Sequence, residues 1–262
     1  MNILVCLKMV SRATYTDMLC SDDASDDRLS GGAIEINPAD AYALETALKL
    51  KDRYGAYVTV LSMSPMLAEP MLRSALAMGA DEAVLVCDRI FAGSDTIATA
   101  KTLSAALKAL PRQDMIFCGS KAIDSETGHI GAQLAALNEL RYMGDVLAVN
   151  ELRDGRLCVK HAGKHGAEEY SLVLPAVFSI INGTGMIRSP TIFGLRSSAK
   201  REIRIMTGDT LHLTAEQKAG KNASGTETVR IDRLSFAHRH GAYTDDVHDG
   251  AAGLAEMLEC AK

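Results

Sequence analysis

Short runs of consecutive apolar residues alternate, over the first two thirds of the chain, with longer stretches in which apolar residues recur every three or four positions. Each run is as continuous as a strand buried on both faces, and the runs cover residues 3–7, 57–62, 83–87, 115–118 and 175–181. The stretches between them have the period of helices and cover residues 38–54, 70–78, 96–110 and 128–137. This alternation predicts an α/β fold with a doubly wound, mainly parallel sheet and helices on both faces.

The pattern changes after residue 140. Three short strand-like segments, separated by turn signals, predict a β-ribbon or an extension of the sheet at residues 145–149, 157–161 and 170–174. From residue 205 the sequence has the composition of an extended arm, with one more helical pattern near its end. We therefore expect an α/β domain over residues 1–184, and a loop with a C-terminal arm over residues 185–262.

The stretch from 114 to 137 carries the clearest candidate site. Its buried strand ends at Gly119, a polar loop follows, and a helix is expected from Gly128. Strand, glycine, loop and helix form the geometry that binds ligands at the carboxyl edge of an α/β sheet. Unpaired N–H groups near the helix start suit a phosphate, and Ser125 and Thr127 would add hydroxyl donors. A glycine-rich turn needed for packing alone would have the same pattern.

Two further helix starts are expected at the same edge. Asn37 and Asp40 favour the beginning of one helix, and Asp95 is a natural N-cap for another. Hydroxyl groups of Thr96 and Thr99 could form a second site for a diphosphate at the latter helix. The alternative is that Asp95 caps the helix and nothing more.

Composition excludes several classes of function. The chain has 262 residues and a net charge of −5, without a Lys/Arg-rich block, so we expect no nucleic-acid partner. No apolar run approaches about 18 residues, so we expect no transmembrane helix. The N-terminus is interpreted as a strand rather than a signal peptide. Six dispersed cysteines without a C-x-x-C pair indicate a reduced, cytoplasmic protein without disulfides or a zinc site.

Two polar clusters are candidate metal sites on composition alone. The Asp/Ser-rich stretch at 20–32 is interpreted as a solvated loop, because nothing in the pattern makes its carboxylates converge. His238, His240 and His248 lack a third ligand at a fixed spacing, so we interpret them as solvated or interface histidines. We therefore expect no metal.

Three separated motifs point to one family. They are Gly119-Ser-Lys-Ala-Ile-Asp124 with Gly131 after it, Asn37-Pro-Ala-Asp-Ala-Tyr-Ala-Leu-Glu45, and Leu76-Ala-Met-Gly-Ala-Asp81. In residues, order and spacing, from residue 1 to about 200, the chain resembles the β subunit of electron-transfer flavoproteins. The fold that this resemblance implies is a Rossmann-like, adenine-nucleotide-binding domain. The chain departs from the family pattern at Met9, Ser11 and Ser120.

The resemblance also implies a function and a set of binding residues. The chain would pair with an FAD-holding α subunit and carry electrons between a dehydrogenase, of acyl-CoA type, and other redox partners. It would have no catalytic acid, base or nucleophile of its own. The nucleotide-binding positions carried over are Cys6, Leu7, Lys8, Asn37, Asp40, Met63, Asp95, Thr96, Thr99, Gly119, Lys121, Ala122, Asp124, Thr127, Gly128, His129, Ile130 and Gly131.

The loop from Asp88 to Thr96 bears on which nucleotide is bound. It reads Asp-Arg, then Gly-Ser-Asp-Thr, and resembles the electron-bifurcating branch of the family. That branch implies FAD in the β-chain pocket, and electrons from NADH divided between the α-subunit FAD and a ferredoxin or flavodoxin. The alternative is a housekeeping β subunit with structural AMP. A second alternative is an adenine-nucleotide-binding regulatory module of the stress-protein class, although its phosphate-loop motif is absent.

Residues 188–204 correspond to the family's partner-recognition loop. By register, Ile192 is the aliphatic residue offered to a pocket of the partner dehydrogenase. The alternative is an ordinary turn whose aliphatic side chain packs into the chain's own core. The arm beyond residue 205 would wrap around the α subunit.

Overall fold

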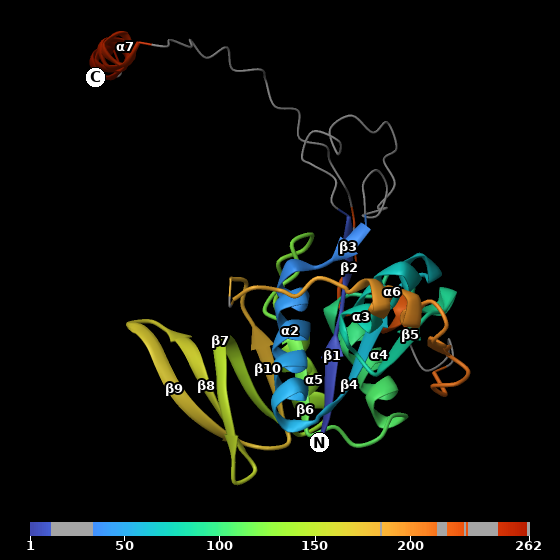
Figure 1. The fold of residues 1–262 in the computed structure, drawn as a ribbon. Helices are drawn as coiled ribbons and strands as arrows, with labels where there is room; N and C mark the ends of the chain where they lie inside the picture. Colours follow the sequence, from blue (N-terminus) through green and yellow to red (C-terminus); the bar gives the residue numbers. More distant parts are fainter. Residues whose placement is uncertain (12–33, 184, 214–218, 228, 230–245, 261–262) are drawn as a thin grey trace. The chain divides into compact units, whose positions relative to one another are not determined.

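The computed structural model describes residues 1–11, 34–183, 185–213, 219–227, 229 and 246–260 (Figure 1). The chain divides into two units, Met1–Thr228 and Val229–Lys262. The described part of the second unit contains helix α7 (Val247–Cys260). The first unit contains a nine-stranded sheet in the order β11-β5-β4-β1-β6-β10-β7-β8-β9.

The sheet is parallel from β11 to β7 and antiparallel from β7 to β9. Its parallel strands are β1 (Asn2–Cys6), β4 (Tyr57–Met63), β5 (Glu82–Val86), β6 (Met115–Gly119), β7 (Arg141–Arg153), β10 (Ala176–Ile180) and β11 (Arg204–Met206). The antiparallel extension adds β8 (Arg156–Gly163) and β9 (Gly166–Val173), and a separate pair joins β2 (Met9–Ser11) to β3 (Ile34–Ile36). The predicted mainly parallel sheet and the predicted ribbon are both confirmed.

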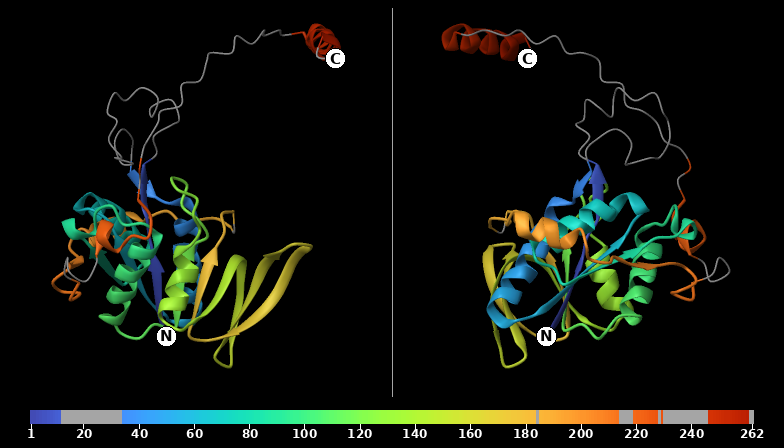
Figure 2. Two further views of the ribbon diagram at one scale, coloured as in Figure 1. Left: turned by 180° about the vertical axis from the view of Figure 1, so that it is seen from behind. Right: turned by 45° about the vertical axis from the view of Figure 1, so that its right-hand side comes forward.

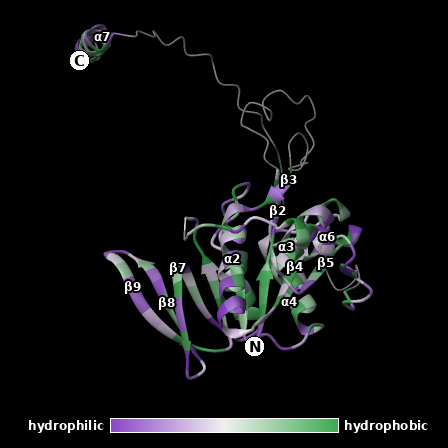
Figure 3. Ribbon diagram, in the orientation of Figure 1, coloured by the Kyte–Doolittle hydropathy of each residue, from purple (hydrophilic) through white to green (hydrophobic). Residues whose placement is uncertain are grey.

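Helices cover both faces of the sheet (Figure 2). One core is built with α2 (Pro38–Tyr54) and α3 (Glu69–Met78), and the other with α4 (Thr96–Lys108) and α5 (Ile130–Leu137). Alternation along β1 sends Ile3 and Val5 into the first core, and Leu4 and Cys6 into the second. The hydropathy colouring in Figure 3 shows the apolar residues concentrated on these central strands.

Local signals set most of the helix ends. Gly55 ends α2 in the left-handed region, with φ of 66°, and Asp95 caps α4 by accepting a hydrogen bond from the amide of Ala98 at 2.9 Å. Asn37 occupies the N-cap position of α2, as predicted, but its side chain makes no capping hydrogen bond. Helix α5 starts at Ile130, two residues later than predicted.

The path of the chain through the sheet determines where a ligand edge lies. From β1 the chain adds β4 and β5 on one side, and it then returns to place β6 on the other side of β1. The carboxyl ends of β1 and β6 therefore form the topological switch point, where open α/β sheets bind ligands.

The described residues 185–213 and 219–227 belong to the first unit. They include α6 (Ile192–Ser198), beside α3 in Figure 1, and β11, which pairs with β5 through Met206 and Val86. The described residues also form the short 3-10 helices η1 (Met66–Ala68), η2 (Arg89–Phe91) and η4 (Gly220–Ala223). The division at residue 184 and the role of the arm stay predictions.

Candidate functional site

A single carboxylate joins the two loops of the switch point. Asp40, in the first turn of α2, accepts a hydrogen bond from the amide of Lys8 at 2.7 Å on one oxygen. Its other oxygen accepts from the amide of Gly119 at 2.8 Å. The end of β1 and the end of β6 are therefore held in register by one side chain. A Cβ on Gly119 would overlap this carboxylate and Ala39, so only glycine allows the approach.

The Asp40 carboxyl group is buried, and this burial dominates its electrostatics. Removal from water raises the pKa of Asp40 to about 6, although the amides of Lys8 and Gly119, the side chain of Asn37 and the charge of Lys8 oppose the shift. Near pH 7 the group is mainly a carboxylate, and it places negative charge just below the candidate site.

Asn37 fixes the loop that follows β6. Its side-chain amide donates to the carbonyl of Lys121 at 3.0 Å, and its oxygen accepts from the amide of Ile123 at 3.1 Å. Its own backbone amide donates to the carbonyl of Lys8 at 2.9 Å. Asn37 therefore connects three segments, and the side chain that was interpreted as a helix cap shapes the ligand loop instead.

The same loop is joined by an ion pair to the segment that follows β1. The Lys8 ammonium lies 2.6 Å from both carboxylate oxygens of Asp124 and 3.4 Å from the hydroxyl of Ser125. Lys121 contacts Glu126 at 3.2 Å in an exposed pair. Thus Lys8, Asn37, Asp40, Gly119 and Asp124, all predicted from sequence, are brought together, with most of their polar atoms used to shape the loops.

The turn before α5 has the geometry of an anion cradle. Gly128 has φ of 64°, and the helix begins after His129, whose side chain makes no capping hydrogen bond. Gly131 lies directly against Ser179 on β10 and Tyr142 on β7, where a Cβ would overlap the Ser179 hydroxyl. The first N–H groups of an α-helix have no intrahelical acceptors, so a helix start of this kind attracts a negatively charged group.

A cavity of about 580 Å³ opens beside this turn. It is lined by Ser120, Lys121, Gly128, Tyr142, Asp145, Ser179, Ile181 and Asn182. Lys121 and Gly128 were predicted, whereas the residues from β7 and from the end of β10 were missed. The sequence signal for this part of the cavity lining was the Asn182-Gly183 turn directly after the last core strand.

The start of α4 was the second predicted cradle. Thr96 accepts a hydrogen bond from the side chain of Gln133 at 3.2 Å, which joins the first turns of α4 and α5. The second oxygen of Asp95 accepts from the amides of Gly225 and Thr226 at 2.7 and 3.1 Å. Burial raises the pKa of Asp95, but these bonds and the Ala98 cap together lower it below its ordinary value. Asp95 therefore caps the helix and also holds the chain's own later segment.

The remaining predicted positions lie at or near the carboxyl edge of the sheet, some in strands and others in a loop or at the start of a helix. Cys6 and Leu7 have buried side chains, so only their backbone can face a ligand, and Met63 ends β4 beside them. Thr99 lies in the first turn of α4. Ala122, Thr127, His129 and Ile130 belong to the loop and to the start of α5. The roles of all these residues in binding stay predictions.

Cys6 lies beside a second buried thiol at the same strand ends. A hydrogen bond with Cys6, together with burial, raises the pKa of the Cys118 thiol well above its usual value. Both cysteines therefore behave as small apolar residues. The four cysteines whose side chains are described, Cys6, Cys87, Cys118 and Cys158, are free.

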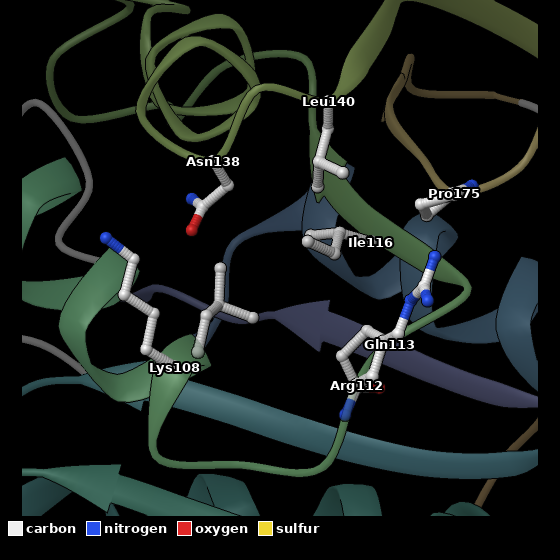
Figure 4. Close-up of a pocket in the computed structure, with 8 residues that line it drawn as sticks. Lys108, Arg112, Gln113, Ile116, Asn138, Leu140 and Pro175 are labelled. Carbon is white, nitrogen blue, oxygen red and sulfur yellow. The ribbon is translucent and has the colours of Figure 1, made fainter.

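A smaller pocket lies at the opposite, amino-terminal end of the strands (Figure 4). It measures about 130 Å³ and is lined in part by Lys108, Gln113, Asn138, Leu140 and Pro175. None of the predicted site residues borders it. Because ligands of open α/β sheets bind at the carboxyl ends of the strands, we assign the candidate site to the larger cavity.

The side chain of Ile192 is exposed to solvent and is not part of the chain's own core. Its side chain is 87 % exposed and that of Phe193 is 81 % exposed. The alternative of an aliphatic plug into the same chain is therefore wrong.

Among the described residues, no group of three or more His, Cys, Asp and Glu side chains is arranged to hold a metal ion. None of the described helices is long and apolar enough to cross a membrane. The Asp/Ser-rich stretch, His238 and His240 lie outside the described residues.

Comparison with known proteins gives consistent matches. Residues 30–203 match the family model described as the electron transfer flavoprotein domain. The electron transfer flavoprotein subunit beta of Thermoanaerobacterium thermosaccharolyticum is 35% identical over 260 residues, 98% of each chain. The CarD subunit of the caffeyl-CoA reductase-Etf complex of Acetobacterium woodii is 34% identical over 88% of this chain and 87% of its own. The electron transfer subunit gamma of the acryloyl-CoA reductase of Anaerotignum propionicum is 43% identical over 61% of this chain and 64% of its own.

Proposed function

This chain belongs to the electron transfer flavoprotein family as a β subunit, and from that premise we propose that it holds FAD at the carboxyl edge between β1 and β6. Electron transfer together with an α subunit follows from the family. The identity of the nucleotide in this pocket, with AMP as the alternative, is the part that we propose.

The observation that carries the proposal is the way in which the loops after β1 and β6 are tied together. Asp40 and Asn37 fasten both loops, and the Gly128 turn, the start of α5 and a cavity of about 580 Å³ lie next to them. Cavities of about 300–1,000 Å³ are typical of small-molecule and cofactor sites. The volume of the cavity and the loops beside it therefore support a nucleotide site.

In this proposal, each part of the carboxyl edge of the sheet has a specific role in binding FAD. Backbone N–H groups at Gly128 to Gly131 would hold a phosphate, and the ammonium of Lys121 would add positive charge at the cavity wall. The start of α4, with Thr96 and Thr99, is the second position for a phosphate, as expected for FAD rather than AMP. FAD supplies the redox chemistry when it is bound, while the protein supplies binding, orientation and electrostatics.

The finer proposal is flavin-based bifurcation with NADH as the electron source. The Asp88–Thr96 loop supports it, as does the similarity to the CarD subunit of a caffeyl-CoA reductase-Etf complex. The partners that we propose are an α subunit, an acyl-CoA dehydrogenase-type flavoprotein that docks at Ile192, and a ferredoxin or flavodoxin. Parts of the arm over residues 205–262, such as Met206 and Gly225, contact the rest of this chain, and we propose that the arm also packs on the α subunit. A cytoplasmic location is part of the same proposal.

The test is a cofactor count. The chain is co-expressed with its α subunit, the bound nucleotides are released, and FAD and AMP are quantified per heterodimer. Two FAD and no AMP are expected, and NADH oxidation is the next assay. One FAD and one AMP would instead indicate a housekeeping β subunit. A folded heterodimer without a nucleotide in this chain would refute the binding site.

A further inference from the structure

Helix α6 presents large apolar side chains to solvent, and the two most exposed of them are next to each other in the sequence. Ile192 and Phe193 are its first two residues, and both are more exposed than any core residue of the chain. Thr191 caps the helix by accepting a hydrogen bond from the amide of Gly194 at 2.9 Å. A seven-residue helix is short for independent stability, so its conformation has to be imposed by neighbouring elements.

Arg73, on α3, holds the carboxyl end of this helix. One guanidinium nitrogen donates to the carbonyls of Ser198, Ala199 and Arg201 at 2.9, 3.4 and 3.2 Å. The other nitrogens donate to one carboxylate oxygen of Glu69 at 2.9 and 2.6 Å, so the guanidinium is itself fixed. The carbonyls at a helix end lack intrahelical donors, and a cation there is favourable.

The middle and the beginning of the segment are held as well. Gly194 lies against the carbonyl of Ala77, where a Cβ would overlap the oxygen, so α6 sits directly on the backbone of α3. Before the helix, Arg188 donates to both carboxylate oxygens of the buried Glu45, at 2.9 and 3.1 Å, and to Asp52 at 2.7 Å. The backbone that carries the apolar pair is therefore held by contacts within this chain.

The charged residues around Ile192 and Phe193 indicate the chemistry of the partner surface on which they dock. Arg196, Lys200 and Arg204 are exposed on or just after α6, against a single exposed acid there, Glu202. A complementary surface has an apolar pocket with acidic residues around it. Two adjacent large side chains also need a pocket that accepts a branched aliphatic group and an aromatic ring together.

We propose that Phe193 is a second anchor beside Ile192, and that Arg73 is the positioning residue that keeps both ready to dock on an acyl-CoA reductase-type flavoprotein. This inference rests on the proposed function. It adds an aromatic residue that selects the partner, because a pocket shaped for one aliphatic side chain has no room for the ring. A preformed helix also loses little conformational entropy on binding, which strengthens binding to the partner.

The test uses the heterodimer with its α subunit, and the acryloyl-CoA reductase of Anaerotignum propionicum as the probe. Dissociation constants are measured by calorimetry for Ile192→Ala, Phe193→Ala and Arg73→Gln, with Met186→Ala as a matched control on an exposed apolar residue outside the helix. We expect about tenfold or greater weakening for each anchor variant, and less than about twofold for the control. Flavin content is expected to be unchanged in all four variants.

Arg73→Gln distinguishes a positioning role from a general structural one. Alone it is expected to weaken binding by roughly three- to tenfold and to speed hydrogen exchange in residues 192–198. In the Phe193→Ala background the same change is expected to cost clearly less, because one anchor is already missing. Additive effects would overturn the role of Arg73.

The outcomes separate this inference from the proposed function. Weak binding by Ile192→Ala with normal binding by Phe193→Ala would overturn the second anchor and leave the single-residue docking intact. Wild-type binding by every variant, or no binding of the wild-type heterodimer to the reductase, would overturn docking at α6. The nucleotide count would be unaffected by either result.

Discussion

Asp40→Asn is the substitution that tests the centre of the site most directly. The wild-type carboxylate accepts one hydrogen bond from Lys8 and one from Gly119, and each is worth about 1.5–3 kcal/mol because the acceptor is charged. Asparagine retains one acceptor oxygen and turns an N–H₂ group toward the second amide. One amide is then left without an acceptor, at a further cost of about 1–3 kcal/mol.

Asp40→Asn also removes a buried negative charge, and the stability gained in this way opposes the loss of the hydrogen bonds. The pKa of Asp40 is raised to about 6 from 3.8, and this difference corresponds to about 3 kcal/mol against the ionised form in the folded protein. Because this net value already includes the hydrogen bonds from Lys8 and Gly119, the stability of the variant at pH 7 alone does not separate the two contributions. The dependence on pH does.

The sign of that dependence follows from the direction of the shift. The folded protein binds the Asp40 proton more tightly than the unfolded chain, so this group stabilises the fold fully below about pH 4, and the contribution is lost as the pH rises through 6. Between pH 7 and pH 5 the wild-type protein should gain about 1.4 kcal/mol from Asp40, and Asp40→Asn should lack this gain.

The assay is urea denaturation of the purified protein at pH 5 and pH 7, with hydrogen exchange at Lys8 and Gly119. Asp154→Asn makes the same chemical change on an exposed turn and controls for the loss of one negative charge. Faster exchange at one of the two amides is expected in Asp40→Asn only. Parallel pH profiles for the wild type and Asp40→Asn would refute the account of this carboxylate.

Three other substitutions test the supports of the site. Gly119→Ala introduces a Cβ that overlaps the first turn of α2, so a loss of about 1–3 kcal/mol or more is expected in denaturation, and unchanged stability would contradict the close approach. Glu45→Gln removes the charge that pairs with Arg188 and should cost about 2 kcal/mol, measured as a lower melting temperature that added salt does not restore. Lys121→Ala should lower nucleotide retention on dialysis, whereas Lys164→Ala, on an exposed turn, should not; equal retention in both would remove Lys121 from the site.

The fold was largely predictable because its elements are signalled locally. The apolar run at residues 115–118 and the helix between Asn37 and Gly55 lie close to the observed β6 and α2. Helix α6 was not foreseen, because its stability comes from Arg73 on α3, more than a hundred residues earlier in the chain. Family membership also removes the stress-protein alternative.

The site was predictable where local patterns mark loops and helix starts, and where the family motifs supply separate positions such as Lys8. The loop from Gly119 to Gly131 has a local pattern, and the structure places it at the switch point. Tyr142 and Ser179 were missed because β7 and β10 reach the cavity through the order of strands in the sheet, which no local spacing encodes. For the same reason Asn37 was interpreted as a cap, although its partners lie on the loop after β6.

The pairing of β11 with β5 bears on how the chain folds while it is being synthesised. Strand β5 is complete by Val86, but its outer neighbour is not made until Arg204–Met206. During that interval the outer edge of β5 presents unpaired N–H and C=O groups, which can pair with the strands of other nascent chains. A segment that looks like a late appendage in the sequence therefore covers this edge of the sheet, but only once residues 204–206 have been synthesised.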